Sequence, residues 1–551
     1  MISSLQEVTG VTLPSINLEQ KIELKEENKK LPKRKNPLLR TKDMSSVTED
    51  SSASHAHGLV RTLTALDLIN LGIGCIIGTG IFVLTGIAAA NYAGPGVFFS
   101  FILAGLACAL AAFVYSEFAS LVPLSGSAYT YVYVTLGEIA AWLIGWTLLL
   151  EYLVSVSVVA IGWSAYFSNI LTNFGLSIPK VFSASPGTPD VPGAIMNLPA
   201  AGITLGLTLL AIAGIKNSTI FNNIIVSIKL FVVLFFIGFG LFHINPQNWT
   251  PFIPERVSTA TGHAVDILHL PFNELIVKLI QGTLSVQNNL VYHYGWQGVL
   301  TAAGIVFFAY IGFDAVSTVA EESKNPQRDL PIGIIGSLIV CTLLYLCVSI
   351  VLTGIIPVTV NGLPNPALIG HEAGAALSVA FTSLGYKWAA LIVAFGALCG
   401  MTSIILVMIV AQARILFSIA RDGLLPKFFS SIHPRYRTPV TATLITGIFS
   451  AIIASFTPIL TVAELTSIGT LAAFVFVSLA VLILRITKPE LKAKFRCPGM
   501  PYTAILGVVV NFLLMTGLPT ATWVRFVVWM IIGFIIYFFY GFWFSKLRVK
   551  E

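Results

Sequence analysis

The chain contains a long succession of apolar runs, each of which can cross a lipid bilayer. The hydrocarbon core of a bilayer is about 30 Å thick, which takes roughly 20 mostly apolar residues in a helix. With 56% hydrophobic and 10% charged residues among 551, the composition excludes an ordinary soluble globular protein. The sequence therefore predicts an all-α integral membrane protein with about twelve transmembrane helices. The twelve runs are 66–90, 96–121, 137–171, 195–215, 219–243, 298–319, 331–356, 387–418, 438–457, 461–485, 502–518 and 523–545.

The basic residues between these runs are unevenly distributed. If the amino terminus is cytoplasmic, 16 lysines and arginines after the first run fall in cytoplasmic segments and 5 in outer segments. Cytoplasmic loops of membrane proteins carry such an excess. We therefore expect a multi-pass protein of the plasma membrane with both termini in the cytoplasm. The net charge of +7 follows from this asymmetry and does not indicate a nucleic-acid partner.

The first apolar run contains four glycines within nine residues, Gly72, Gly74, Gly78 and Gly80. Such a run favours a broken helix, and inside a bilayer broken backbone is tolerated only where protein or a water-filled cavity satisfies it. A glycine-interrupted span is also a sequence indicator of a transporter binding site. The alternative is that these glycines allow close packing between helices.

A second break is predicted at Phe308–Phe313 in the sixth run. At about 1.5 Å per helical residue, Gly78–Gly80 lie about 18–21 Å along the first run, and Phe308 lies about 15 Å along the sixth. Both helices are thus expected to be broken near the bilayer midplane, on spans that run in opposite directions. This pattern predicts two inverted five-helix repeats.

The two breaks present complementary backbone groups. The outer half of the first span begins with free amides near Thr79 and Gly80, which suit a carboxylate. The first half of the sixth span ends with free carbonyls at Phe308, Ala309 and Ile311, which suit an ammonium group. A site that presents both at one depth indicates a zwitterionic ligand, of which an α-amino acid is the simplest.

Ionisable residues inside the runs are further candidates. Lys229 lies about ten residues into the fifth run, where a lysine costs about 2.5–3.5 kcal/mol on insertion scales. It is expected to carry a proton or to act as a fixed cation in place of a metal ion; the alternative is a lysine that extends to the membrane interface. Glu117 and Glu151 are expected in gating or structural ion pairs, and Asp314 to cap the resumed sixth helix.

Motifs of catalysis and metal binding are not found in the sequence. Five of the six cysteines lie in predicted spans and do not resemble a disulfide framework or a zinc site. The Gly78–Gly80 triplet lacks the strand and the lysine of a phosphate-binding loop. We therefore expect no enzymatic activity, no metal and no organic cofactor.

These features divide the chain into segments with different expected roles. Residues 1–60 are expected to form a disordered cytoplasmic tail, or a basic segment that lies against anionic lipid headgroups. Within the outer loop, Pro271–Val286 is expected to form an amphipathic surface helix. The expected segments are the tail 1–60, the first repeat 61–243, the outer loop 244–297, the second repeat 298–485, the last two helices 486–545 and a cytoplasmic end 546–551.

Five motifs in the chain show a family resemblance: Ile76–Gly86 (IIGTGIFVLTG), Val122–Tyr131 (VPLSGSAYTY), Phe307–Asp314 (FFAYIGFD), Glu321–Arg328 (EESKNPQR) and Arg421–Pro426 (RDGLLP). In these motifs the chain resembles the cationic amino acid transporter family of the amino acid–polyamine–organocation (APC) superfamily, most closely its bacterial-type permeases. The resemblance covers about residues 59–545 and implies a LeuT-like fold of two inverted five-helix repeats plus two C-terminal helices.

The resemblance implies functional residues. Substrate carboxylate would meet Ile77–Gly80, and substrate amine would meet the Phe308–Ile311 segment, in which Phe308 closes over the substrate. Lys229 matches the family's lysine at the place where sodium-coupled relatives bind an ion, which implies proton coupling. Met408 stands where true cationic transporters have a smaller residue, so the pocket is expected to favour neutral over cationic amino acids. The substrate-binding set is Ile77, Gly78, Thr79, Gly80, Phe308, Ala309, Tyr310, Ile311 and Met408.

The resemblance also implies an activity. We expect a proton-coupled secondary active transporter that imports amino acids by alternating access, with an amino acid and the lipid bilayer as its partners. Two alternatives remain open at this point: an amino acid exchanger without net ion coupling, and a membrane receptor that binds amino acids without transporting them.

Overall fold

The computed structural model is helical through most of its length. Residues Thr41–Glu551 form one compact unit, to which all helices and strands named here belong. The predicted tail 1–60 lies outside the described residues, apart from positions 40–42. The described residues are 40–42, 63–121, 127–188, 191–213, 219–260, 267–281, 290–360, 363–369, 372–436, 438–487, 489 and 493–549.

A described helix lies in every predicted apolar run. Within the described residues, eight helical segments are long and apolar enough to cross a membrane, and four shorter apolar helices accompany them. The count of twelve crossings stays a prediction, because the first long segment, Gly80–Leu121, combines parts of two predicted runs. The main helices are α4 (Ala65–Ile76), α5 (Thr85–Ala88), α6 (Val97–Leu121), α7 (Ser127–Thr135), α8 (Glu138–Asn173), α9 (Leu198–Ile212), α10 (Thr219–Leu241), α11 (Phe272–Ile280), α12 (Gly295–Val306), α13 (Pro326–Ile355), α14 (Ala376–Ser383), α15 (Lys387–Arg421), α16 (Val440–Phe456), α17 (Ile459–Thr487), α18 (Tyr502–Thr516), α19 (Thr520–Ile536), α20 (Phe542–Phe544) and α21 (Lys546–Val549).

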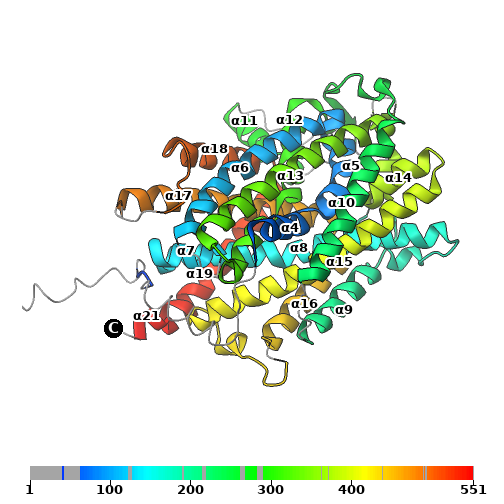
Figure 1. Ribbon diagram of the computed structural model, residues 1–551. Helices are drawn as coiled ribbons and strands as arrows, with labels where there is room; N and C mark the ends of the chain where they lie inside the picture. Colours follow the sequence, from blue (N-terminus) through cyan, green and yellow to red (C-terminus); the bar gives the residue numbers. More distant parts are fainter. Residues whose placement is uncertain are drawn as a thin grey trace, which may run out of the picture. The chain divides into compact units, whose positions relative to one another are not determined.

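Helix α8 lies at the centre of the helix packing. It contacts α15, α17, α16 and α9, and α9 also lies beside α16 (Figure 1). The side chains of α8 are mostly apolar on every face of the helix, and most of them are buried. A helix that is apolar all round is typical of a protein interior or a membrane span. The other helices are therefore arranged around an interior element that itself carries candidate site residues.

Helix α4 is fixed at its beginning and along one face. Thr64 and Asp67 form a reciprocal capping box, in which the Thr64 amide donates to the Asp67 carboxylate at 2.9 Å, and such boxes stabilise helix starts. The helix packs beside α13 (Figure 1). A Cβ at Gly72 would lie 2.4 Å from Ser337 Oγ on α13. Gly72 therefore serves close packing, which is the alternative role considered for the glycines of this run.

The beginning of α13 differs from that of the predicted run 331–356. The helix begins at Pro326, so Pro331 lies inside it. Proline is favoured in the first turn of a helix because the amide it lacks has no intrahelical acceptor there. At Pro331 the missing N–H removes one helical hydrogen bond. The predicted run was therefore five residues too short at this end.

The outer loop contains the surface helix expected within 271–286, and α11 covers Phe272–Ile280 without a buried residue. Positions 282–289 lie outside the described residues. Strand β1 (Val257–Ala260) pairs antiparallel with β2 (Leu290–His293), so that Val257 faces His293. A second short antiparallel pair joins β3 (Thr359–Val360) to β4 (Leu363–Pro364). All four strands lie in the connections between the apolar helices.

Glu117 at the end of α6 forms an ion pair with Arg485 at the end of α17. Arg485 donates from Nε and from its terminal nitrogen to the two carboxylate oxygens at 2.9 and 2.7 Å. The Cys497 amide donates to the same carboxylate at 2.7 Å. Bidentate charged hydrogen bonds are among the stronger polar contacts in proteins. The structure thus places Glu117 in the kind of structural pair that was expected for it.

Replacing Glu117 by alanine is expected to destabilise the protein. Arg485 and the Cys497 amide would lose their acceptor, and an unsatisfied buried group costs about 1–3 kcal/mol. The thermal unfolding midpoint in detergent should fall clearly. The control is Glu274→Ala, which removes an exposed pair with Arg256 (2.6 Å) of a kind worth about 0–1 kcal/mol. Equal midpoints for the two variants would contradict this role for Glu117.

Candidate functional site

The first apolar span is broken where its glycines predicted. Helix α4 ends at Ile76, and Ile77 has extended backbone angles (φ −72°, ψ 103°). Helical structure resumes in a π-helical turn at Gly80–Leu84. The first amides of a helix have no acceptor within it. The second part of the span therefore begins at the interior of the molecule, where the amides of Ile81 and Phe82 donate to the Gly78 carbonyl, both at 3.2 Å.

The sixth span is broken as well, but its second part differs from the expectation. Helix α12 continues into a 3-10 turn at Phe307–Tyr310, and Ile311 is extended (ψ 136°). Gly312 has a φ of +115°, a conformation that favours glycine. The chain resumes as a 3-10 helix over Asp314–Glu322 rather than an α-helix. Its first residue is Asp314, whose carboxylate accepts a bond from Tyr152 at 2.8 Å and lies against backbone amides at the start of this helix, among them that of Ala315.

The two breaks touch each other. A Cβ at Gly80 would lie 2.2 Å from the Cα of Ala309, and one at Gly312 would lie 2.9 Å from the carbonyl oxygen of Cys75. Distances under 3.0 Å are essentially never observed for real Cβ atoms. Glycine is therefore required at both positions so that the two broken backbones can meet.

Tyr345 on α13 links the two breaks, a role that the sequence did not reveal. Its hydroxyl lies 2.9 Å from the Ile76 carbonyl and 2.8 Å from the Ala309 carbonyl. Its side chain is fully buried. It therefore holds the end of α4 and the 3-10 turn of the sixth span at a common point. A tyrosine in an apolar run carries no pattern that distinguishes this role from core packing.

A small cavity lies between the breaks, α8 and α15. Its volume is about 10 Å³, which is about the space that one water occupies. Binding of a larger molecule therefore requires the lining side chains to move. The cavity is lined by Cys75, Ile76, Gly78, Thr79, Gly80, Ser155, Val159, Phe308, Ile311, Ile404 and Met408.

Six of the nine predicted substrate-binding residues line this cavity: Gly78, Thr79, Gly80, Phe308, Ile311 and Met408. The other three are buried but do not line the cavity. Ile77 forms the extended link, Ala309 packs against Gly80, and the Tyr310 hydroxyl donates to the Phe101 carbonyl at 2.9 Å. Sequence reasoning missed Cys75, Ile76, Ser155, Val159 and Ile404, because nothing in a single apolar helix shows which face meets the breaks.

Two hydroxyl groups of the cavity lining have no hydrogen-bond partner in the part of the chain that the structure describes. They are Thr79 Oγ1 and Ser155 Oγ, and both are buried. An unsatisfied buried polar group costs about 1–3 kcal/mol. A polar ligand in the cavity would remove that cost, so the lining favours binding of a molecule with hydrogen-bonding groups.

Lys229 on α10 is fully buried beside the first break. Its Nζ donates to the carbonyl of Gly74 on α4 at 2.6 Å. A Cβ at Gly400 on α15 would lie 3.0 Å from the lysine Cε. Across the described residues, no carboxylate forms a salt bridge with this lysine. The amine thus sits between α4 and α15, away from the protein surface.

Glu151 on α8 departs from the ion pair that was expected for it. Both carboxylate oxygens are buried and have no hydrogen-bond partner among the described residues. The charged group that acts on it most strongly is Asp314, which has the same sign. The Tyr152 hydroxyl donates to Asp314 at 2.8 Å. The interior therefore contains two acidic groups close together rather than an acid paired with a base.

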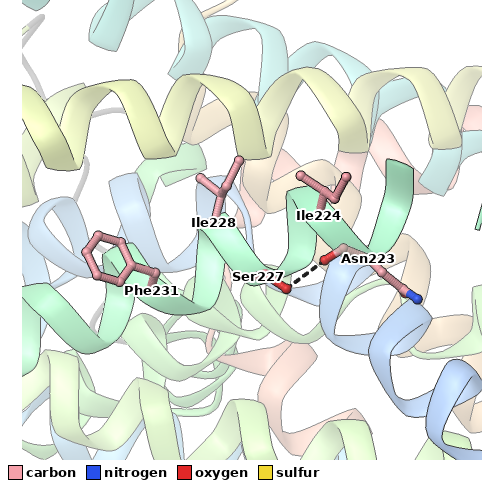
Figure 2. A pocket seen from close by; sticks show the side chains of 5 residues that line it. All are labelled: Asn223, Ile224, Ser227, Ile228 and Phe231. Atoms are coloured by element: carbon pink, nitrogen blue, oxygen red, sulfur yellow. Dashed lines mark hydrogen bonds between the residues drawn. The ribbon is translucent and has the colours of Figure 1, made fainter. Parts of the chain in front are cut away.

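A larger hollow, of about 510 Å³, lies elsewhere. Figure 2 shows that its lining side chains come from one stretch of α10, where the Ser227 hydroxyl donates to the Asn223 carbonyl. Ser227 and Phe231 are exposed, whereas Lys229 is buried on the opposite side of the same helix. This hollow is therefore part of the outer surface of the helix bundle. Its lining residues are Asn223, Ile224, Ser227, Ile228 and Phe231.

Two apolar helices that break at one buried site are typical of membrane transport proteins. Comparison with known proteins agrees with this class. Residues 63–543 match the model of a family described as "Amino acid permease". The methylthioribose transporter of Bacillus subtilis (strain 168) is 45% identical over 491 residues, which is 89% of this chain and 95% of that protein.

Two further relatives are similar. The branched-chain amino acid permease BcaP of the same organism is 44% identical over 499 residues, 90% of this chain and 97% of that protein. The vacuolar cationic amino acid transporter 4 of Arabidopsis thaliana is 36% identical over 456 residues, 83% and 68% of the two chains. The chain belongs to the amino acid permease family. Its relatives are permeases and transporters, not enzymes, so the expected lack of enzymatic activity is confirmed.

Replacing Gly80 by alanine is expected to abolish ligand binding while leaving a folded protein. The added methyl group would lie 2.2 Å from Ala309 Cα and would force the two breaks apart. The control is Gly202→Ala on α9, where a Cβ meets nothing within 4 Å. Binding of labelled leucine to the purified variants, with size-exclusion profiles as the test of folding, checks this. Wild-type affinity in Gly80→Ala would disprove the importance of the contact.

Proposed function

We propose that this protein imports neutral amino acids by alternating access, coupled to the proton gradient. The observation that carries the proposal is the contact between the two breaks. The amides of Thr79 and Gly80, where the first span resumes its helix, suit a carboxylate. Carbonyls near Phe308 and Ile311 suit an ammonium group. A zwitterion placed between them would meet both ends at once, and the hydroxyls of Thr79 and Ser155 would add hydrogen bonds.

The apolar lining supports a neutral side chain. Val159, Phe308, Ile404 and Met408 contribute to the cavity, and no charged side chain lines it in the part of the chain that is described. A buried cationic side chain would need an acidic partner, because an unpaired buried charge is costly. A relative with 44% identity is named as a branched-chain amino acid permease. Leucine, isoleucine and valine are therefore the first substrates to test.

A second candidate is a thioether sugar. It is favoured by the relative named as a methylthioribose transporter, which is 45% identical over 89% of this chain. Such a molecule is neutral and suits an apolar pocket that contains a methionine. It has neither a carboxylate nor an ammonium group, so it would use the backbone groups of the two breaks less fully. Competition between methylthioribose and leucine for uptake distinguishes the two.

Lys229 supports proton coupling. A charged amine bonds more strongly to a carbonyl than a neutral amine does. Gain or loss of the lysine proton would thus change how firmly α4 is held through Gly74. Because α4 is the inner half of the first broken span, its movement would open or close the site toward one side of the membrane. Protonation and the direction of access would then change together.

The proposal also includes the arrangement of the helices and the orientation of the chain in the membrane. We infer two inverted repeats, residues 61–243 and 298–485, each beginning with a broken helix, and two further helices in 486–545. The excess of basic residues on one side supports cytoplasmic termini in the plasma membrane. In this arrangement α4 would be the cytoplasmic half of its span.

Uptake into proteoliposomes tests the proposal. Labelled leucine, alanine, arginine and methylthioribose are offered with and without an inward proton gradient. We expect the gradient to drive leucine accumulation in the wild type and in Lys387→Ala, whose lysine is exposed. Lys229→Ala should lose at least tenfold of the gradient-driven uptake. Uptake that needs internal amino acid but ignores the gradient would show an exchanger, and binding without uptake would show a receptor.

Shortening Met408 is expected to widen specificity. Met408→Ser would lengthen the pocket, so larger or cationic amino acids should compete several-fold better against leucine. Met401→Ser is the matched control, because Met401 is buried on the same helix but does not line the cavity. Competition uptake assays with arginine measure the change. Identical competition in both variants would remove Met408 from the specificity determinants.

A further inference from the structure

A second cavity lies at the beginning of α13, outside the site between the breaks. Its volume is about 490 Å³, within the range of ligand pockets in proteins. One part of its lining is basic, from Arg328 and Lys494. The other part is apolar, from Ile332, Ile335, Ile339 and Phe495. A cavity with charge at one end and apolar side chains at the other suits an amphiphilic ligand.

The two basic residues are available to an anion. Both are exposed, and neither forms a salt bridge within the described ranges. The neighbouring carboxylate of Asp329 is buried and accepts a bond from the Asn325 amide at 3.2 Å. That carboxylate is therefore already hydrogen-bonded to the backbone at the beginning of its own helix. The charge at this end of the cavity is positive.

The apolar part continues along the helix surface. Ile332, Ile339 and Leu343 are 39%, 55% and 60% exposed on α13. From Arg328 to Leu343 the helix rises about 22 Å at 1.5 Å per residue. One leaflet of a bilayer, with its headgroups, is about 20–22 Å thick. The basic end and the apolar stripe are thus spaced like the headgroup and the acyl chain of one lipid.

We propose that this cavity binds an anionic phospholipid of the surrounding bilayer. The phosphate lies between Arg328 and Lys494, and an acyl chain follows Ile332, Ile339 and Leu343. Basic pockets next to membrane helices bind anionic headgroups by this combination of charge and apolar contact. The excess of basic residues on this side of the chain agrees with the anionic lipid of a cytoplasmic leaflet.

The proposed lipid cavity borders α4, the first part of the broken first span. Gly336 lines the cavity, and a Cβ there would lie 3.0 Å from Ile69 on α4. The same helix α13 carries Tyr345, which contacts both breaks. A lipid bound in the cavity therefore lies against the place where α4 and α13 contact each other. Its binding should change the rate at which the protein moves between its conformations.

Native mass spectrometry of the delipidated protein tests the proposal, with phosphatidylglycerol and phosphatidylcholine as probes. The test variant is Arg328→Gln with Lys494→Gln. The matched control is Lys427→Gln with Arg435→Gln, which removes two cations that do not line the cavity. We expect wild type and control to bind phosphatidylglycerol at least fivefold better than phosphatidylcholine. The test variant should lose this preference.

Other outcomes decide against the proposal. An equal loss in the control would show nonspecific attraction to the basic surface. Equal binding of both lipids by the wild type would rule out a site for anionic headgroups, and full competition by inorganic phosphate would rule out the acyl contact. The exchange variant Arg328→Lys with Lys494→Arg should keep the preference, which guards against misfolding. These readouts do not need transport, so they separate failure of the lipid site from failure of the proposed function.

Discussion

The close approach of two broken backbones is the constraint on which the rest of the structure depends. Gly80 and Ala309 leave no room for a methyl group between them, so the first and sixth spans must break at the same place. Tyr345 then joins the two broken ends through their carbonyls, and Lys229 holds α4, the first part of the first span, through Gly74. Each of these contacts comes from a different helix, and together they define the position of the candidate site.

Helix α13 has more roles than its place outside the site suggests. It packs against α4 through Ser337 and Gly72, and it carries the tyrosine that contacts both breaks. The cavity proposed for a lipid lies at its beginning. A change at one end of this helix can therefore be passed along it to the candidate site. A lipid bound as proposed would give the surrounding bilayer a route by which it acts on that site without touching the substrate.

Features that are determined by short stretches of the sequence could be predicted. The apolar runs predicted a helix in each position, the glycines at 72–80 and the segment at 308–313 predicted both breaks, and a lysine in an apolar run predicted a buried amine. Contacts across the fold could not be predicted. Tyr345 and Ser155 look like ordinary residues of apolar helices, and Glu151 lies near another acid rather than a base. The predicted run 331–356 began five residues after the start of α13, because the first turn of this helix is polar and begins with a proline, which suits a first helical turn.

The small volume of the central cavity has an electrical consequence. About 10 Å³ holds no more than about one water, so no continuous file of water can pass between the breaks in this conformation. Protons and small ions cross membranes readily only along such files. In this conformation the contact between the breaks therefore also closes the space between them to a chain of water molecules along which a proton could pass.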